Sequence, residues 1–191
     1  RELGFNYVFD TDFAADLTVM EEGSEFLERF THKKDYRWPM FTSCCPGWVR
    51  FLKSQYPERT EELSTAKSPQ QMFGAIAKTY FAEKIGIDPK RLFVVSIMPC
   101  IAKKSETLDL NIKDNADYAM TFGEIRAMMR AKGVELQPAE NDYQESSVFG
   151  KRFGNGGGVT AAVLECLKEM DENSKKRHVT GIGLTSIHEL M

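Results

Sequence analysis

Residues 92–98 read Leu92-Phe93-Val94-Val95-Ser96-Ile97-Met98, a nearly unbroken apolar run that is followed by Pro99 and Cys100. A short apolar run of this kind predicts a strand buried on both faces in the centre of a parallel sheet. Proline interrupts such a strand, so Cys100 is expected just past its carboxyl end. Open α/β sheets bind their ligands at that edge. The run therefore predicts an α/β fold with a thiol where ligands bind.

Other segments alternate between helical and strand patterns. Ser68-Pro69-Gln70-Gln71 is typical of a helix start, and Gly86 is expected to end that helix after Lys84. Thr121 and Glu124 have the spacing of a second capping box. Helices are expected at 15–30, 47–56, 68–84, 121–133 and after Gly158, and further strands at 39–43, 118–121 and 179–184. These elements predict mostly parallel sheets flanked by helices.

The composition is that of a globular protein with a real core: 191 residues, 42% hydrophobic and 28% charged. No apolar run approaches the ~20 residues that cross a bilayer, and no signal peptide pattern opens the chain, so a cytoplasmic protein is expected. The net charge of -3 argues against nucleic-acid binding, and the basic cluster at 175–178 is typical of a solvated turn. Arg1 to Phe5 resemble the last turn of a helix, so the chain is expected to begin within a domain.

The four cysteines indicate metal-binding or catalytic thiols rather than disulfides. Their spacing contains no C-x-x-C pair, which argues against a zinc ribbon or a ferredoxin-type cluster. Cys44 and Cys45 are neighbours that would form a strained disulfide, and on a turn their side chains are expected to diverge. Cys166 lies in a helical pattern and is expected to be a buried apolar side chain. Cys44, Cys45 and Cys100 therefore remain as candidates for function.

Glycines cluster at Gly154-Asn155-Gly156-Gly157-Gly158, just before a predicted helix. Such a loop can hold a phosphate, but no Lys-Ser or Lys-Thr pair follows it, as a nucleotide-binding loop would require. Close packing of the loop against a neighbouring segment or a cluster is the better interpretation, because glycine lets backbones approach.

Two motifs carry a resemblance to a known family. Thr42-Ser43-Cys44-Cys45-Pro46-Gly47-Trp48 and the MPCxxKxxE stretch from Met98 to Glu106 resemble the first two signature motifs of the [FeFe]-hydrogenase catalytic domain. Residues 4–22 and 66–71 and the glycine loop look like the same family, whereas its third motif, with two more cluster cysteines, is absent. The resemblance implies that residues 1–191 are a partial iron-hydrogenase large-subunit catalytic domain. It also implies two lobes with the cluster site between them.

The resemblance implies a cofactor and a reaction. In this family four cysteines hold a [4Fe–4S] cubane linked to a diiron unit with CO, cyanide and dithiolate ligands, the H-cluster. By similarity, Cys45 and Cys100 are two of the cubane ligands. The implied reaction is the reversible reduction of protons to H₂, with ferredoxin or a similar electron carrier as partner. A missing segment or a second chain is expected to complete the site.

The resemblance also implies roles for further residues. Cys44 resembles the thiol that exchanges protons with the cofactor, and Glu22, Ser64 and Glu25 match the family's relay to solvent. Glu22 and Glu25 are three residues apart, so they share a helix face. Lys103 matches the lysine that donates a hydrogen bond to a cyanide, a strong charge-assisted contact. Four residues are expected to shape and dry the pocket, namely Met98, Pro99, Gln70 and Phe153.

Two alternatives to a hydrogenase stay open. One is a non-enzymatic, hydrogenase-like iron–sulfur assembly protein, and the other is an inactive truncated module. Cys44 with Glu22 and Glu25 favours a hydrogenase, since assembly relatives lack the relay thiol. The iron content of protein purified without oxygen would separate the inactive module from the other two.

Overall fold

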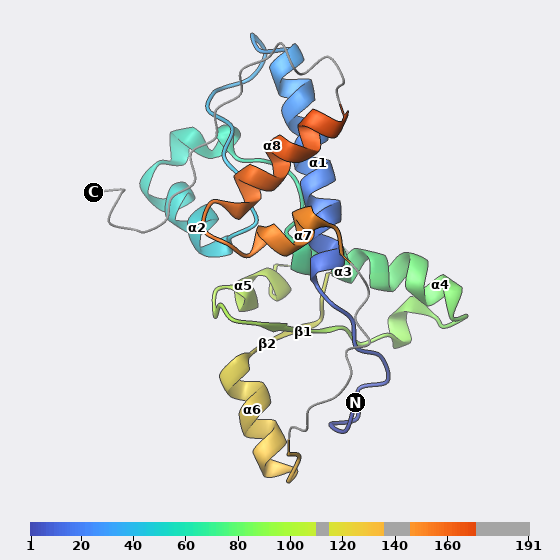
Figure 1. Ribbon diagram of the computed structural model, residues 1–191. Helices are drawn as coiled ribbons and strands as arrows, with labels where there is room; N and C mark the ends of the chain where they lie inside the picture. The colour runs from blue at the N-terminus through green and yellow to red at the C-terminus, as the bar shows by residue number, and fades with distance from the viewer. Residues whose placement is uncertain (110–114, 136–145, 171–191) are drawn as a thin grey trace. The chain divides into compact units, whose positions relative to one another are not determined.

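A computed structural model describes residues 1–109, 115–135 and 146–170, and the chain forms two compact units (Figure 1). The first unit comprises Arg1–Thr11 and Gln70–Glu145, and the second comprises Asp12–Pro69 and Ser146–Met191. Each unit therefore joins segments that are distant in the sequence. The predicted strand at 179–184 and the basic cluster at 175–178 lie outside the described residues.

The first unit contains a parallel pair of strands, β1 (Val95–Met98) and β2 (Tyr118–Thr121), in register from Val95 opposite Tyr118 to Met98 opposite Thr121. Parallel strands need a crossover connection, and here it contains the short helix α5 (Lys103–Thr107). Asp117 fixes the start of the pair, because its carboxylate accepts hydrogen bonds from the Val94 N–H at 2.7 Å and from Lys78 Nζ at 2.6 Å. The sheet confirms the α/β class.

The predicted strand at 92–98 is shorter and more exposed than its apolar sequence suggested. The 3₁₀ turn η3 (Pro89–Arg91) precedes it, and regular pairing begins only at Val95. Phe93 is 71% exposed and Ile97 is 39% exposed. The prediction of burial on both faces is therefore wrong for the described part of the chain, where β1 has β2 as its strand partner.

The predicted helix at 68–84 forms, but it is not a uniform α-helix. It consists of α3 (Pro69–Ile76), the π-helical turn η2 (Ala77–Phe81) and α4 (Ala82–Lys84), and it ends before Gly86, whose φ is +67°. Gly74 has a packing role, since a Cβ there would lie 2.4 Å from the Ala116 backbone nitrogen. α3 can therefore approach the chain just before β2.

The second strand leads directly into α6 (Phe122–Ala131), as predicted. The capping box is present: Thr121 Oγ1 accepts a hydrogen bond from the Glu124 N–H at 3.3 Å, and Glu124 accepts one from the Thr121 N–H at 2.7 Å. At the start of the chain, the Gly4 N–H donates to the Arg1 carbonyl at 2.8 Å, which closes a single turn where a helix end had been expected.

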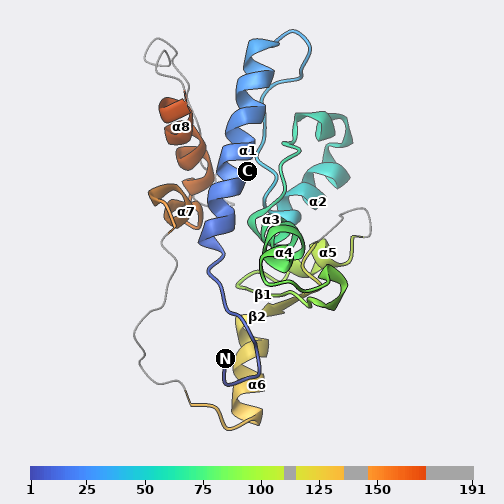
Figure 2. The same ribbon diagram turned by 90° about the vertical axis from the view of Figure 1, so that its right-hand side faces the viewer.

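The second unit is built on α1 (Asp12–Thr31), against which α7 (Val148–Phe153) and α8 (Gly158–Met170) pack. Figure 2 shows α8 and the helix α2 (Pro46–Gln55) on opposite sides of α1. The 3₁₀ helix η1 (Pro57–Glu62) follows α2. The buried core between α1 and α8 comprises Val19, Ala162, Val163, Cys166 and Leu167. The predicted helices at 15–30, at 47–56 and after Gly158 are thus confirmed.

The predicted strand at 39–43 is wrong as an extended element. Among the described residues this segment forms one bridge, between Phe41 and Leu63. There the Phe41 N–H donates to the Glu62 carbonyl at 2.8 Å and the Ser64 N–H donates to the Phe41 carbonyl at 2.7 Å. Pro39 has no N–H to extend the pairing in one direction, and α2 begins at Pro46 in the other. The bridge nevertheless fixes Ser64 beside the segment that leads to Cys44.

The glycine loop has the packing role that its sequence suggested. A Cβ on Gly158 would lie 1.9 Å from the Arg152 carbonyl oxygen, so the turn from α7 into α8 requires glycine at this position. α7 itself is fixed to α1, because Asp16 accepts hydrogen bonds from the Ser147 N–H at 2.8 Å and the Gly150 N–H at 2.7 Å.

Candidate metal-binding and proton-transfer residues

The four cysteines all lie within the described residues, and none of them forms a disulfide. Cys45 is exposed and immediately precedes α2. Its backbone carbonyl accepts the first hydrogen bond of that helix, from the Val49 N–H at 3.0 Å. Cys100 is exposed and follows β1. Cys44 is half-buried, whereas Cys166 is only 6% exposed in the helical core, which confirms the prediction for that residue.

Cys45 and Cys100 have the chemistry that an iron–sulfur cluster requires. Both thiols are accessible at turns, where a thiolate can reach a metal, and thiolate sulfur is the usual ligand of such clusters. They belong to different units, and among the described residues no three Cys, His, Asp or Glu side chains gather as a metal site. Each of these two thiols, taken by itself, therefore fits the chemistry of a cluster ligand.

Glu22 is a buried carboxyl on α1, with 1% of its surface exposed. Its Oε1 accepts one long hydrogen bond, 3.4 Å from the Ser43 N–H, and its Oε2 has no hydrogen-bond partner in the described structure. Burial is the largest influence on Glu22 and raises its pKa from 4.5 to about 7. The Ser43 N–H and the Ser64 hydroxyl lower this pKa by less, and the charge of nearby Glu25 raises it slightly. A carboxyl with this pKa can hold or release a proton near neutral pH.

Glu25 lies one turn further along the same helix and is joined to Ser64. Ser64 Oγ donates a 2.6 Å hydrogen bond to Glu25 Oε2, and the Thr65 N–H donates to the same oxygen at 3.0 Å. A hydroxyl both donates and accepts, so Ser64 can receive a hydrogen bond from protonated Glu22 while it donates to Glu25. The structure thus brings together Glu22, Ser64 and Glu25, three residues that the sequence resemblance had grouped.

Arg29 belongs to this cluster but was not predicted from the sequence. Its Nη2 lies 2.6 Å from Glu25 Oε1 and 2.8 Å from the Leu63 carbonyl oxygen, and only 5% of the side chain is exposed. The guanidinium therefore holds Glu25 in one orientation and supplies its countercharge. The four-residue spacing of Glu25 and Arg29 on a helix is the signal that could have identified the pair.

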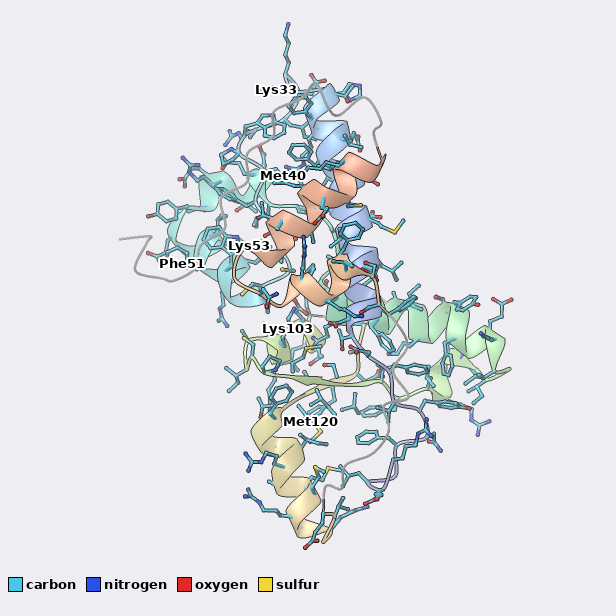
Figure 3. The ribbon with its side chains drawn as sticks, in the orientation of Figure 1. Lys33, Met40, Phe51, Lys53, Lys103 and Met120 are labelled. Atoms are coloured by element: carbon cyan, nitrogen blue, oxygen red, sulfur yellow. The ribbon has the colours of Figure 1, made fainter. Side chains whose placement is uncertain are left out.

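The first unit contains a second polar cluster, around Gln70. The side chain of Gln70 is 1% exposed, and its Nε2 donates to the Lys103 carbonyl at 3.0 Å and to Glu106 Oε2 at 3.1 Å. Ser96 Oγ donates to Gln70 Oε1 at 2.6 Å, and Lys103 Nζ lies 3.1 Å from Glu106 Oε1. Lys103, the first residue of α5, is labelled in Figure 3. Gln70 therefore connects β1 with α5 through its own amide.

The other residues predicted to shape a pocket lie in different surroundings. Met98 is the half-buried last residue of β1, and Pro99 beside Cys100 is exposed. Phe153 packs against the core between α1 and α8. Their predicted contribution to a cofactor pocket stays a prediction.

The raised pKa of Glu22 predicts a dependence of stability on pH. Between pH 4.5 and 7 the folded chain holds the Glu22 proton more tightly than the unfolded chain does, so the free energy of unfolding should fall as pH rises. The expected loss is about 3 kcal/mol across this range. Urea denaturation at several pH values should show this fall in the free energy of unfolding in the natural sequence and not in Glu22→Gln. Glu21→Gln, at an exposed position of the same helix, serves as the control and should retain it.

Comparison with known proteins identifies the family. Residues 1–190 match the model of the iron-only hydrogenase large subunit, C-terminal domain, and the chain belongs to this family. It is 43% identical over 183 residues to the NADP-reducing hydrogenase subunit HndD of Solidesulfovibrio fructosivorans, a match that covers 89% of the chain and 31% of that protein. It is 44% identical over 171 residues to the periplasmic [Fe] hydrogenase large subunit of Nitratidesulfovibrio vulgaris, a match that covers 86% of the chain and 40% of that protein.

A solved structure gives the same result. An apo [FeFe]-hydrogenase variant from Chlamydomonas reinhardtii superposes with a TM-score of 0.74 at 40% identity, covering 96% of the chain and 47% of that structure. The chain thus spans about a third of HndD and less than half of that solved chain. These matches confirm the resemblance and the fold class.

Relatives with another stated role also match. The cytosolic Fe–S cluster assembly factor narfl of Danio rerio is 34% identical over 174 residues, covering 83% of the chain and 42% of that protein. The family is therefore shared by hydrogenases and proteins named for cluster assembly. No helix in the described part of the chain is long and apolar enough to cross a membrane. A cytoplasmic location stays a prediction, since one relative is named as periplasmic.

Proposed function

We propose that the chain is part of the catalytic domain of an [FeFe]-hydrogenase, which reversibly reduces protons to H₂. The observation that supports this most directly is the buried Glu22, whose pKa is near 7, hydrogen-bonded to the backbone of Ser43 beside Cys44. Hydrogen production consumes protons, so it needs groups that deliver them to a dry site. A protein that only carries or assembles a cluster has no such need.

The proposed cofactor is the H-cluster, with Cys45 and Cys100 as two of its cubane ligands. When bound, it would supply the redox chemistry by which protons and electrons combine. The remaining ligands are proposed to come from a further segment of the family domain or from a second chain. Lys103 is proposed to bind an anionic ligand of the diiron unit, and Met98, Pro99 and Phe153 to keep water from the site.

The chain's own contribution to the reaction is proton transfer. Cys44 is proposed to exchange a proton with the cofactor, because a thiol can act as an acid or a base near neutral pH. Glu22 then exchanges with Cys44, and Ser64 passes the proton between Glu22 and Glu25. Arg29 holds the Glu25 carboxylate in place at 2.6 Å. Electrons are proposed to come from ferredoxin or a similar carrier.

The ligand assignment can be tested by iron content. In a polypeptide that contains these residues with the rest of the family domain, Cys45→Ser and Cys100→Ser should each lower the iron bound after anaerobic purification and remove the cubane signal in electron paramagnetic resonance. Cys166→Ala, in the helical core, is the matched control and should keep its iron. Retention of the cubane signal in both ligand variants would refute the assignment.

A role in cluster assembly is the second candidate, supported by the 34% identity to the Danio rerio assembly factor. It predicts a protein that binds iron and produces no H₂. Iron content and H₂ production measured on the same anaerobic preparation therefore separate the two functions. A preparation that binds no iron would favour the inactive module instead.

A further inference from the structure

We infer that Glu106 is a positioning residue, which holds Lys103 and Gln70 with its two carboxylate oxygens and thereby fixes the turn that carries Cys100. The inference rests on the proposed function, in which Lys103 meets an anionic ligand. Glu106 is the last residue of the MPCxxKxxE stretch, and sequence analysis assigned it no role. Only 6% of its surface is exposed.

The first oxygen of Glu106 fixes the ammonium group of Lys103. Oε1 lies 3.1 Å from Lys103 Nζ, and the two side chains are 6% and 14% exposed. A lysine side chain is long and has many rotamers, so a charged partner is needed to keep its head group in one place. An ammonium has three donors, so the pair with Glu106 is compatible with donation to an anionic ligand as well.

The second oxygen of Glu106 connects this pair to the sheet. Oε2 accepts a hydrogen bond from Gln70 Nε2 at 3.1 Å, and Gln70 Oε1 accepts one from Ser96 Oγ at 2.6 Å. Ser96 belongs to β1, the strand that ends just before Cys100. Gln70 Nε2 also binds the Lys103 carbonyl at 3.0 Å, so the side chain and the backbone of Lys103 are held by the same network.

The carbonyl of Glu106 is also engaged. Asn115 Nδ2 donates to it at 2.5 Å, while Asn115 Oδ1 accepts from the Ala116 N–H at 2.8 Å. This contact ties α5 to the segment that enters β2. Glu106 is therefore held in place by contacts that do not involve Lys103. A residue that positions another one needs such independent support.

The test measures the accessibility of Lys103 in protein without a cluster. Trace acetylation with acetic anhydride, read by mass spectrometry, gives the rate at Lys103 relative to Lys78 in the same molecule. Lys78 is a matched reference, because it is 15% exposed and paired with Asp117 at 2.6 Å in the same unit. In Glu106→Gln the ratio of Lys103 to Lys78 should rise about tenfold, which corresponds to about 1.4 kcal/mol.

Two further variants complete the design. Asp117→Asn should raise acetylation of Lys78 alone, which shows that the ratio reports individual ion pairs. Glu106→Asp keeps the charge but is one methylene shorter, so it should give a smaller rise and serves if Glu106→Gln does not fold. A ratio that stays within about twofold of the natural sequence overturns the inference. An equal rise at both lysines also overturns it, because Glu106 would then support only the fold.

The measurement is independent of hydrogenase activity. If the protein proves unable to make H₂ but the ratio rises in Glu106→Gln, the positioning role stands and the proposed function fails. If the protein makes H₂ and the ratio does not change, the proposed function stands and the positioning role fails.

Discussion

Cys44→Ala is expected to reduce H₂ production by about a hundredfold or more, the usual contribution of a proton donor placed next to the reacting group. The side chain is half-buried beside exposed Cys45, and its neighbour Ser43 contacts buried Glu22. Alanine removes the proton-carrying atom and adds none. Because the cubane ligands are proposed to be other cysteines, the iron content of the variant should equal that of the natural protein.

The measurement is H₂ production with a reduced viologen dye, made on the polypeptide that contains the whole family domain and accompanied by iron analysis. Cys166→Ala is the control, because this cysteine lies in the core between α1 and α8 and is assigned neither to the cluster nor to proton transfer. It should lose some stability and keep its activity. Normal turnover in Cys44→Ala would exclude the thiol from proton transfer.

Much of the fold could be predicted from local sequence signals. The capping box of Thr121 and Glu124 defined the start of α6, and Gly86 defined the end of the helix that begins at Pro69. The π-helical turn at Ala77–Phe81 has no comparable signal, because it depends on how that helix packs. The exposure of Phe93 was missed for a related reason: an apolar run indicates a strand, but it does not say which surfaces are present to cover it.

The candidate site was predictable in its residue types and less so in its contacts. Glu22 and Glu25 could be placed on one face of a helix by their spacing, but on spacing alone both would be ordinary solvated glutamates. Burial of Glu22 depends on tertiary packing. The approach of Ser64 to the two glutamates does too, because Ser64 comes directly after Leu63, which forms the bridge with Phe41. Arg29 and Glu106 were missed although Glu25 and Lys103, with which they form ion pairs, lie four and three residues away in the sequence. Their contacts with the Leu63 carbonyl and with Gln70 depend on tertiary packing and have no such signal.

A polypeptide of these 191 residues alone is expected to produce no H₂ with a reduced viologen dye, even after anaerobic reconstitution. A cubane needs four protein ligands, and the sequence has four cysteines, of which Cys166 is buried and Cys44 is assigned to proton transfer. Cys45 and Cys100 alone should bind iron substoichiometrically and should not retain a diiron unit. Large apolar side chains such as Phe93, Ile101 and Leu108, which are 71%, 73% and 77% exposed, should also make this polypeptide prone to association.

Iron per chain, H₂ evolution and sedimentation of the purified polypeptide test this expectation together. Adding the remaining part of the family domain, as a longer polypeptide or as a second chain, should restore both iron binding and H₂ evolution, because it supplies the missing thiolates. Sustained H₂ evolution by the 191 residues alone would show that other side chains replace those cysteines. In that case, the assignment of Cys44 to proton transfer would be the first to reconsider, since it is the third accessible thiol that the chain possesses.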